Sequence, residues 1–183
     1  METGARGAPI PGVSDARACF AGPELAYVVT GAGAVRVLGR ANDYFCLGVR
    51  ADPGQVIGPT DLPGVRSPSV IVNDGVSGFA LAGEALWGWG ANNAQRLSAD
   101  PSVTGYWEPQ VLAGPAPLDL DTSFAWHTGT VAIDRDGSLI GWGERAAVYA
   151  TAAAPADRLV TWDWIDTRVI ELGRGRDFVG LLG

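Results

Sequence analysis

The stretch that decides the fold is Ala85-Leu86-Trp87-Gly88-Trp89-Gly90, because it has a counterpart on either side of it in the chain. The counterparts are Ala34-Val35-Arg36-Val37-Leu38-Gly39 and Ser138-Leu139-Ile140-Gly141-Trp142-Gly143. Their last residues, Gly39, Gly90 and Gly143, are 51 and 53 residues apart. Self-similarity at a fixed period is the signature of a repeat architecture. These anchor glycines therefore mark a structural unit of about 50 residues.

Each anchor segment follows a turn and a short apolar segment. The turns are Thr30-Gly31-Ala32-Gly33, Ala82-Gly83-Glu84 and Asp134-Arg135-Asp136-Gly137, and glycine-rich or Asp-Gly pairs supply the positive φ of tight hairpins. The apolar segments before them are 26–29, 79–81 and 131–133, and 178–182 begins a fourth copy. Each unit is thus predicted to contain a strand, a tight turn and a strand that ends at Trp-Gly or its equivalent.

The rest of each unit also indicates strands. Pro68 and Pro109 occupy similar places and are expected at strand starts, where a ladder donor is not needed. The alternation in 167–172 suits a half-buried strand, and no segment has the pattern of an amphipathic helix. We therefore expect an all-β protein, a β-propeller with blades of four-stranded antiparallel sheets and about three and a half repeats. A solenoid is the competing architecture.

Composition limits the function. The chain of 183 residues has 26 glycines, 12 prolines and a formal net charge of −7, which disfavours nucleic-acid partners. It contains no lysine, which excludes Schiff-base and phosphate-loop lysine chemistry. No apolar run is long enough to span a membrane, and residues 1–19 are predicted to form a flexible segment without a signal peptide. The cysteines, Cys19 and Cys46, are read as free thiols of a cytoplasmic protein, with a disulfide as the alternative.

Residues 129–143 resemble the regulator-of-chromosome-condensation (RCC-type) repeat family, in which an Ala-Leu pair, Asp-Gly and an apolar pair precede Trp-Gly. Residues 89–97 and 39–48 resemble the family's next motif, Trp-Gly-x-Asn-x-x-Gly-Gln-Leu-Gly. The histidine usual before the Ala-Leu pair is replaced by Ser77, Gly129 and Asp177, which marks a divergent, bacterial-type member. Family members include a nucleotide-exchange factor and a β-lactamase inhibitor.

The resemblance covers residues 20–183 and implies a seven-bladed ring, of which this chain would supply half. A second copy or a partner chain would then complete the ring, with the strands near 26–29 and 178–182 pairing across chains or within a shared blade. The alternative is that the sequence is a segment of a longer protein.

Few residues point to catalysis, and no cofactor or metal is expected. His127 is the single histidine, so neither a triad with a second histidine nor a multi-histidine metal site is available. Asp134-Arg135-Asp136-Gly137 lacks the further ligands of a calcium loop and is read as a hairpin turn. The pairs Asp119/Asp121 and Asp163/Asp166 leave open a hydrolase using loop carboxylates, but solvated loop acids are the preferred interpretation. Gly173-Arg174-Gly175-Arg176 is expected to pair with carboxylates rather than to bind phosphate.

The aromatic residues carry the functional prediction. Trp87, Trp89 and Trp142 fall at repeat positions and are expected in the blade core. The predicted partner-binding residues lie in or near the inserts: Tyr106, Trp107, Tyr149, Trp162 and Trp164. Trp and Tyr dominate interface hot spots, which favours a non-catalytic protein-interaction scaffold with a protein partner, possibly its own copy as a homodimer. The alternatives are a carbohydrate or small-ligand binding module that uses these aromatics, and a structural role at the core edge.

Overall fold

The computed structural model describes residues 9–112, 117, 119–121, 129–143, 160–161, 171–174 and 179–182. Its first sheet joins four antiparallel strands in chain order: β1 (Ala16–Gly22), β2 (Leu25–Thr30), β3 (Ala34–Arg40) and β4 (Val56–Arg66). The second sheet joins β5 (Val70–Asn73), β6 (Ser77–Ala82), β7 (Ala85–Ala91) and β8 (Gly105–Val111), with the short 3-10 helix η1 (Asn93–Gln95) between β7 and β8.

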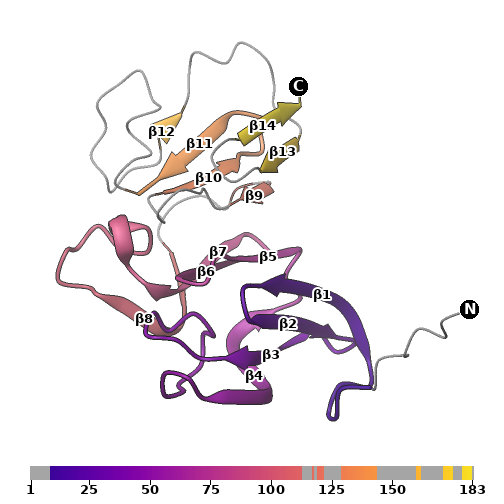
Figure 1. Ribbon diagram of the computed structural model, residues 1–183. Coiled ribbons are helices and arrows are strands. Elements are labelled where there is room, and N and C mark those ends of the chain that lie inside the picture. The colour runs from indigo at the N-terminus through magenta and orange to yellow at the C-terminus, as the bar shows by residue number, and fades with distance from the viewer. Residues whose placement is uncertain are drawn as a thin grey trace, which may run out of the picture.

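The third sheet joins β9 (Asp119–Asp121), β10 (Thr130–Ile133), β11 (Leu139–Trp142) and β12 (Val160–Thr161). A two-stranded sheet of β13 (Glu171–Arg174) and β14 (Val179–Leu182) follows. Figure 1 shows the four sheets following one another through the molecule. We call them blades 1 to 4. The predicted all-β fold, with three and a half units of antiparallel blades, is confirmed. β1 begins at Ala16, within the segment 1–19 predicted to be flexible, and the division at residue 20 stays a prediction.

The repeated hairpins form where the sequence places them. The same pair of positions meets in each blade: Tyr27 with Val37, Phe79 with Gly88, and Val131 with Gly141. The Asp134 carboxylate closes the third hairpin by accepting hydrogen bonds from the backbone N–H groups of Asp136 (2.9 Å) and Ser138 (2.8 Å). This turn is therefore a hairpin turn, as predicted.

Glycine is required at the anchors because the backbone there is left-handed and crowded. Gly39, Gly90 and Gly143 have φ values of 144°, 96° and 100°. A Cβ atom added at Gly90 would lie 2.3 Å from the carbonyl oxygen of Val76. Only glycine tolerates this combination of conformation and close approach.

The prolines within strands lie on sheet edges. β4 contains Pro59 and Pro63, and β8 contains Pro109. Both strands are the last of their sheets, and both pair with register shifts. Pro109 lies inside β8 rather than at its start, so that part of the prediction is wrong. An edge strand accepts it because the missing N–H would not have bonded a neighbouring strand.

Two hydrophobic clusters fill the boundaries between blades. Tyr27, Val37 and Leu47 of blade 1 surround Trp89 of blade 2 in the first cluster. The second cluster repeats this arrangement, with Phe79 and Leu97 of blade 2 packed against Trp142 of blade 3. Full burial of a large apolar side chain contributes about 1.5–3 kcal/mol. The core of this protein therefore lies between the blades.

Candidate binding site

A repeated tryptophan contact fixes each blade on the one before it. Trp89 Nε1 donates to the carbonyl oxygen of Cys46 at 3.0 Å, and Trp142 Nε1 donates to the carbonyl oxygen of Arg96 at 3.0 Å. The Trp89 ring meets the Tyr27 ring edge-on at a centroid distance of 5.5 Å, and Trp142 meets Phe79 likewise at 6.0 Å. The predicted core role of Trp89 and Trp142 is confirmed by this burial.

The boundary of blades 1 and 2 holds a complete polar network. The Tyr27 hydroxyl donates to the Cys46 carbonyl at 2.8 Å and accepts from Trp89 Nε1 and Asn73 Nδ2, each at 3.0 Å. Asn73 Nδ2 also reaches the Cys46 carbonyl at 2.8 Å. Burial raises the pKa of Tyr27 far above its ordinary value. The hydroxyl therefore stays protonated and serves structure.

The boundary of blades 2 and 3 replaces this network with an ion pair. Arg96 Nη1 lies 2.7 Å from Asp74 Oδ2, and its guanidinium lies over the Phe79 ring, 5.5 Å from the centroid. Burial by itself would raise the pKa of Asp74, but the Arg96 charge and hydrogen bond lower it to about 2. Arg96 Nε and Nη2 are buried without a hydrogen-bond partner. The arginine is enclosed on all sides, so this boundary too is structural.

One surface that could meet partners is the one with the long loops. Because successive strands are antiparallel, the connections alternate between two faces of the blades. One face carries the β2–β3 and β6–β7 turns. The other carries the β1–β2 and β5–β6 turns together with the connections 41–55 and 92–104, and we call it the long-loop face. Asn92 holds the second connection by accepting from Leu97 N (2.8 Å) and donating to the carbonyl oxygens of Ser98 and Val103 (each 2.9 Å). Asn42 donates to the Gly75 carbonyl at 2.6 Å from the matching position of the first connection.

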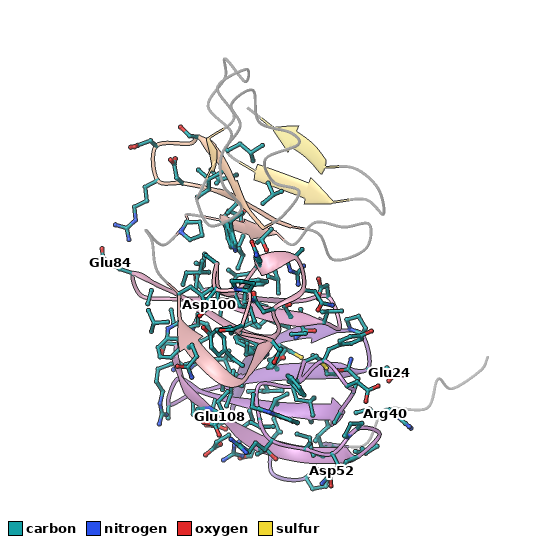
Figure 2. All side chains as sticks on the ribbon, turned by 90° about the vertical axis from the view of Figure 1, so that its left-hand side faces the viewer. Glu24, Arg40, Asp52, Glu84, Asp100 and Glu108 are labelled. Carbon is teal, nitrogen blue, oxygen red and sulfur yellow. The ribbon has the colours of Figure 1, made fainter. Side chains whose placement is uncertain are left out.

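A pocket of about 340 Å³ opens where blades 1 and 2 meet. Its lining residues are Arg50, Ala51, Asp52 and Gln55 of the 41–55 connection and Trp107 of β8. Figure 2 labels Asp52 and Glu108, the neighbour of Trp107 in β8, in the lower part of the molecule. The Trp107 ring packs on Phe45 with a centroid distance of 4.0 Å and an interplanar angle of 32°. The Arg50 guanidinium carbon lies 6.0 Å from the centroid of Trp107.

The polar groups of this pocket have unused hydrogen-bonding capacity. Gln55 Oε1 accepts from Asp52 N at 3.1 Å, and Gln55 N donates to the Asp52 carbonyl at 2.9 Å, which makes the turn between them rigid. Within the described part of the chain, neither the Arg50 guanidinium nor the Asp52 carboxylate forms an ion pair. The pocket therefore offers donors, acceptors and an aromatic ring together, with charges of both signs.

The predicted partner-binding residues are found in different settings. Trp107 lines the pocket, whereas the half-buried Tyr106 packs against the second hydrophobic cluster. Tyr149, Trp162 and Trp164 lie outside the described residues, as do His127, Asp163 and Asp166. Asp119 lies in β9, and the described residues contain no group of three His, Cys, Asp or Glu side chains that could hold a metal ion. Among those residues no helix is long and apolar enough to cross a membrane.

Sequence reasoning missed Phe45, Arg50, Asp52 and Gln55. The Asp52-Pro53-Gly54 turn indicates a long connection between two strands, and this was the signal available for these residues. The sequence did not show that β8 pairs with β7, which places Trp107 next to this connection.

Comparison with known proteins supports the fold. No family model and no curated protein sequence matches the chain. Yeast RCC1 (Prp20) in its complex with Kap60 superposes with a TM-score of 0.74 at 16% identity, covering 92% of this chain and 42% of that one. Prp20p from Saccharomyces cerevisiae, in a study of its binding to Gsp1p and histones, gives 0.71 at 17% identity, with 92% and 43% covered. Human WBSCR16 gives 0.58 at 19% identity, with 80% and 37% covered.

Proposed function

We infer the function from the RCC1-type β-propeller fold, and the chain spans less than half the length of the structures that share it. We propose that the protein is a non-catalytic protein-interaction scaffold whose half ring is completed by a second copy or by a partner chain. The observation that carries this proposal is the difference in burial between blades 1 and 2.

Among the described residues, blade 2 packs between blades 1 and 3. Blade 1 packs on a blade on one side only, and on its other side Arg36 donates to the Gly12 carbonyl and Val28 is 4% exposed. In β3, Val35 and Val37 point toward blade 2 and are buried, while Arg36 and Leu38 on the opposite side are half-buried. Leu38 occupies the register position that Trp89 occupies in blade 2, where the tryptophan is 0% exposed. The open side of blade 1 thus corresponds to the side on which blades 2 and 3 each pack against the blade before them.

The strand next to it shows the same difference. Cys19 of β1 pairs with Val28, and Ile71 of β5 pairs with Ala80, so the two residues are equivalent. Cys19 is exposed, whereas Ile71 is 4% exposed against blade 1. We call Cys19, Ala21, Ala26, Val28, Arg36 and Leu38 the open face, although Val28, between Cys19 and Arg36, is only 4% exposed. A partly apolar sheet face of this kind is suited to bury itself against another blade.

The pairing scheme expected for the ring needs one correction. The segment 26–29 lies in β2, which is bonded to β1 on one side and to β3 on the other. It has no free edge to pair across chains, so that prediction is wrong. Packing of a blade on the open face does not require such an edge.

Several observations agree with a protein partner in the cytoplasm. The structure of Prp20p was described together with its binding properties to Gsp1p and histones, which supports protein binding as the use of this fold. A net charge of −7 argues against a nucleic-acid partner here. Cys19 and Cys46 are both free thiols, which supports a reducing compartment.

The test is a comparison of two substitutions in static light scattering. Leu38→Asp places a charge on the open face, and Val111→Asp places one on an exposed edge strand, where the side chain is 59% exposed. We expect the wild-type chain and Val111→Asp to associate and Leu38→Asp to lose association while it keeps its β-sheet circular dichroism. Equal masses for the two variants would contradict a role for the open face.

A second candidate function, binding of a carbohydrate or another small ligand, is supported by the pocket that Trp107 lines. This function would use the long-loop face and is compatible with the scaffold.

A further inference from the structure

We propose that the pocket between the 41–55 connection and β8 binds a neutral sugar. This inference deepens the second candidate function and does not depend on the scaffold. It rests on three properties of the pocket: its aromatic wall, the kinds of polar groups around that wall, and the balance of their charges.

The aromatic wall is held in place from both blades. Trp107 is supplied by β8 of blade 2, and Phe45, which packs on it at 4.0 Å, is supplied by the 41–55 connection of blade 1. Phe45 has a φ of 60°, a conformation that a bulky residue seldom adopts and that the surrounding loop must maintain. The indole is thereby fixed as a rigid platform. The C–H face of a pyranose ring is apolar and flat, and it packs on such a ring.

The polar groups suit hydroxyl groups. Arg50 offers guanidinium donors, Asp52 offers carboxylate acceptors and Gln55 offers its Nε2 donors, since its Oε1 is already bonded to Asp52 N. A ligand that meets all three must donate and accept within a short distance. A sugar hydroxyl does both at one atom, and neighbouring hydroxyls present this pattern repeatedly.

The charge balance selects a neutral ligand. Arg50 and Asp52 contribute one positive and one negative charge to the lining. An anion would gain from Arg50 but would be repelled by Asp52, and a cation would meet the reverse. A neutral polyol meets no such opposition. The volume of about 340 Å³ lies at the lower end of the range for small-ligand pockets, which fits one sugar unit rather than a long chain.

The connection that supplies the polar groups is held in shape by its own hydrogen bonds. The 41–55 connection is bonded to itself through Ala41, which donates to the Gln55 carbonyl at 2.8 Å and accepts from Gly54 N at 2.8 Å. The backbone of Asp52 and Gln55 is therefore placed in advance, and little ordering of this turn is needed on binding. The pocket is open to solvent and offers few contacts, so we expect a dissociation constant on the order of 1 mM for a single sugar.

The experiment is a saturation-transfer NMR titration of the full chain with methyl glycosides of glucose, galactose and mannose and with N-acetylglucosamine. Glucuronate serves as the anionic comparator and argininamide as the cationic one. We expect at least one neutral sugar to bind, and Asp52→Asn or Gln55→Ala to weaken it by about tenfold, which corresponds to the loss of one good hydrogen-bonding group. Asp43→Asn is the matched control, because Asp43 is an exposed carboxylate of the same connection outside the pocket.

Trp107→Ala should abolish the signal. Since Trp107 is half-buried on Phe45, the exposed substitutions at Asp52 and Gln55 carry the test if that variant unfolds. The proposal is overturned if no neutral sugar binds the folded chain, if binding survives all three pocket substitutions, or if only a charged comparator binds. None of these results alters the native mass, so failure here is distinguishable from failure of the scaffold proposal.

Discussion

At the scale of single residues, we expect Tyr27 and Trp89, the two aromatic members of the contact between blades 1 and 2, to contribute unequally to the free energy of unfolding. Tyr27→Phe removes a hydroxyl, but Asn73 Nδ2 and Trp89 Nε1 both keep the Cys46 carbonyl as an acceptor. We expect it to lower the free energy of unfolding by about 1 kcal/mol. Trp89→Ala removes a fully buried side chain and should cost about 3–5 kcal/mol. Urea denaturation measures both, and equal losses would contradict this view of the boundary.

The buried ion pair at the next boundary predicts a dependence on pH. Burial raises the pKa of the Asp74 carboxyl, but Arg96 outweighs it and lowers the pKa from 3.8 to about 2. The unfolded chain therefore binds the proton first as the pH falls. The stabilisation by Asp74 is complete above about pH 4 and is lost as the pH falls toward 2.

Asp74→Asn tests this assignment. Its deficit in the free energy of unfolding relative to wild type should be largest near pH 6 and should shrink toward pH 2. Asp43→Asn is the control, since Asp43 is exposed and its carboxylate forms no hydrogen bond or ion pair among the described residues. A deficit for Asp74→Asn that stays constant from pH 6 to pH 2 would argue against the ion pair.

At the scale of the elements, we expect the stability of the repeat to be most sensitive to substitution of the anchor glycines. Gly90→Ala forces a side chain into a backbone with a φ of 96° and places Cβ 2.3 Å from the Val76 carbonyl oxygen. We expect it to destabilise the protein by about 3 kcal/mol, or to prevent folding, since strain and a backbone clash add. Gly58→Ala is the matched control, because a Cβ there meets nothing within 4 Å. Thermal unfolding that is equal for the two variants would refute the explanation.

The hairpins and their order were predictable from the sequence because their signals are local. Asp134 and Gly137 occupy the first and last positions of one turn, and the apolar segments on either side pair with each other. The edge strands were harder to place, since Pro109 lies inside β8 and its tolerance depends on the absence of a further strand. The pocket was predicted only through Trp107. Its other wall comes from blade 1. Neither segment alone contains a pattern that predicts packing between residues so distant in the sequence.

At the scale of the whole molecule, the reactivity of the Cys19 thiol measures whether the open face is covered. It is exposed, whereas Cys46 is 1% exposed and burial raises the pKa of its thiol to about 11. In dilute protein at pH 8 we expect one thiol per chain to react quickly with Ellman's reagent and Cys19→Ser to remove that phase. If the open face is covered on association, the rate should fall as the protein concentration rises. A fast phase that persists in Cys19→Ser would contradict the assignment of Cys19 as the exposed thiol and Cys46 as the buried one.

The central claim is that blade 1 packs against another blade that this chain does not itself supply. The most direct measurement is the native mass of the purified chain by light scattering at micromolar concentrations, together with its unfolding transition. We expect a dimer, or a chain that becomes cooperatively stable only with a partner that covers Arg36 and Leu38. A monomer of 19.0 kDa that is well folded, cooperative in unfolding and stable alone would contradict it.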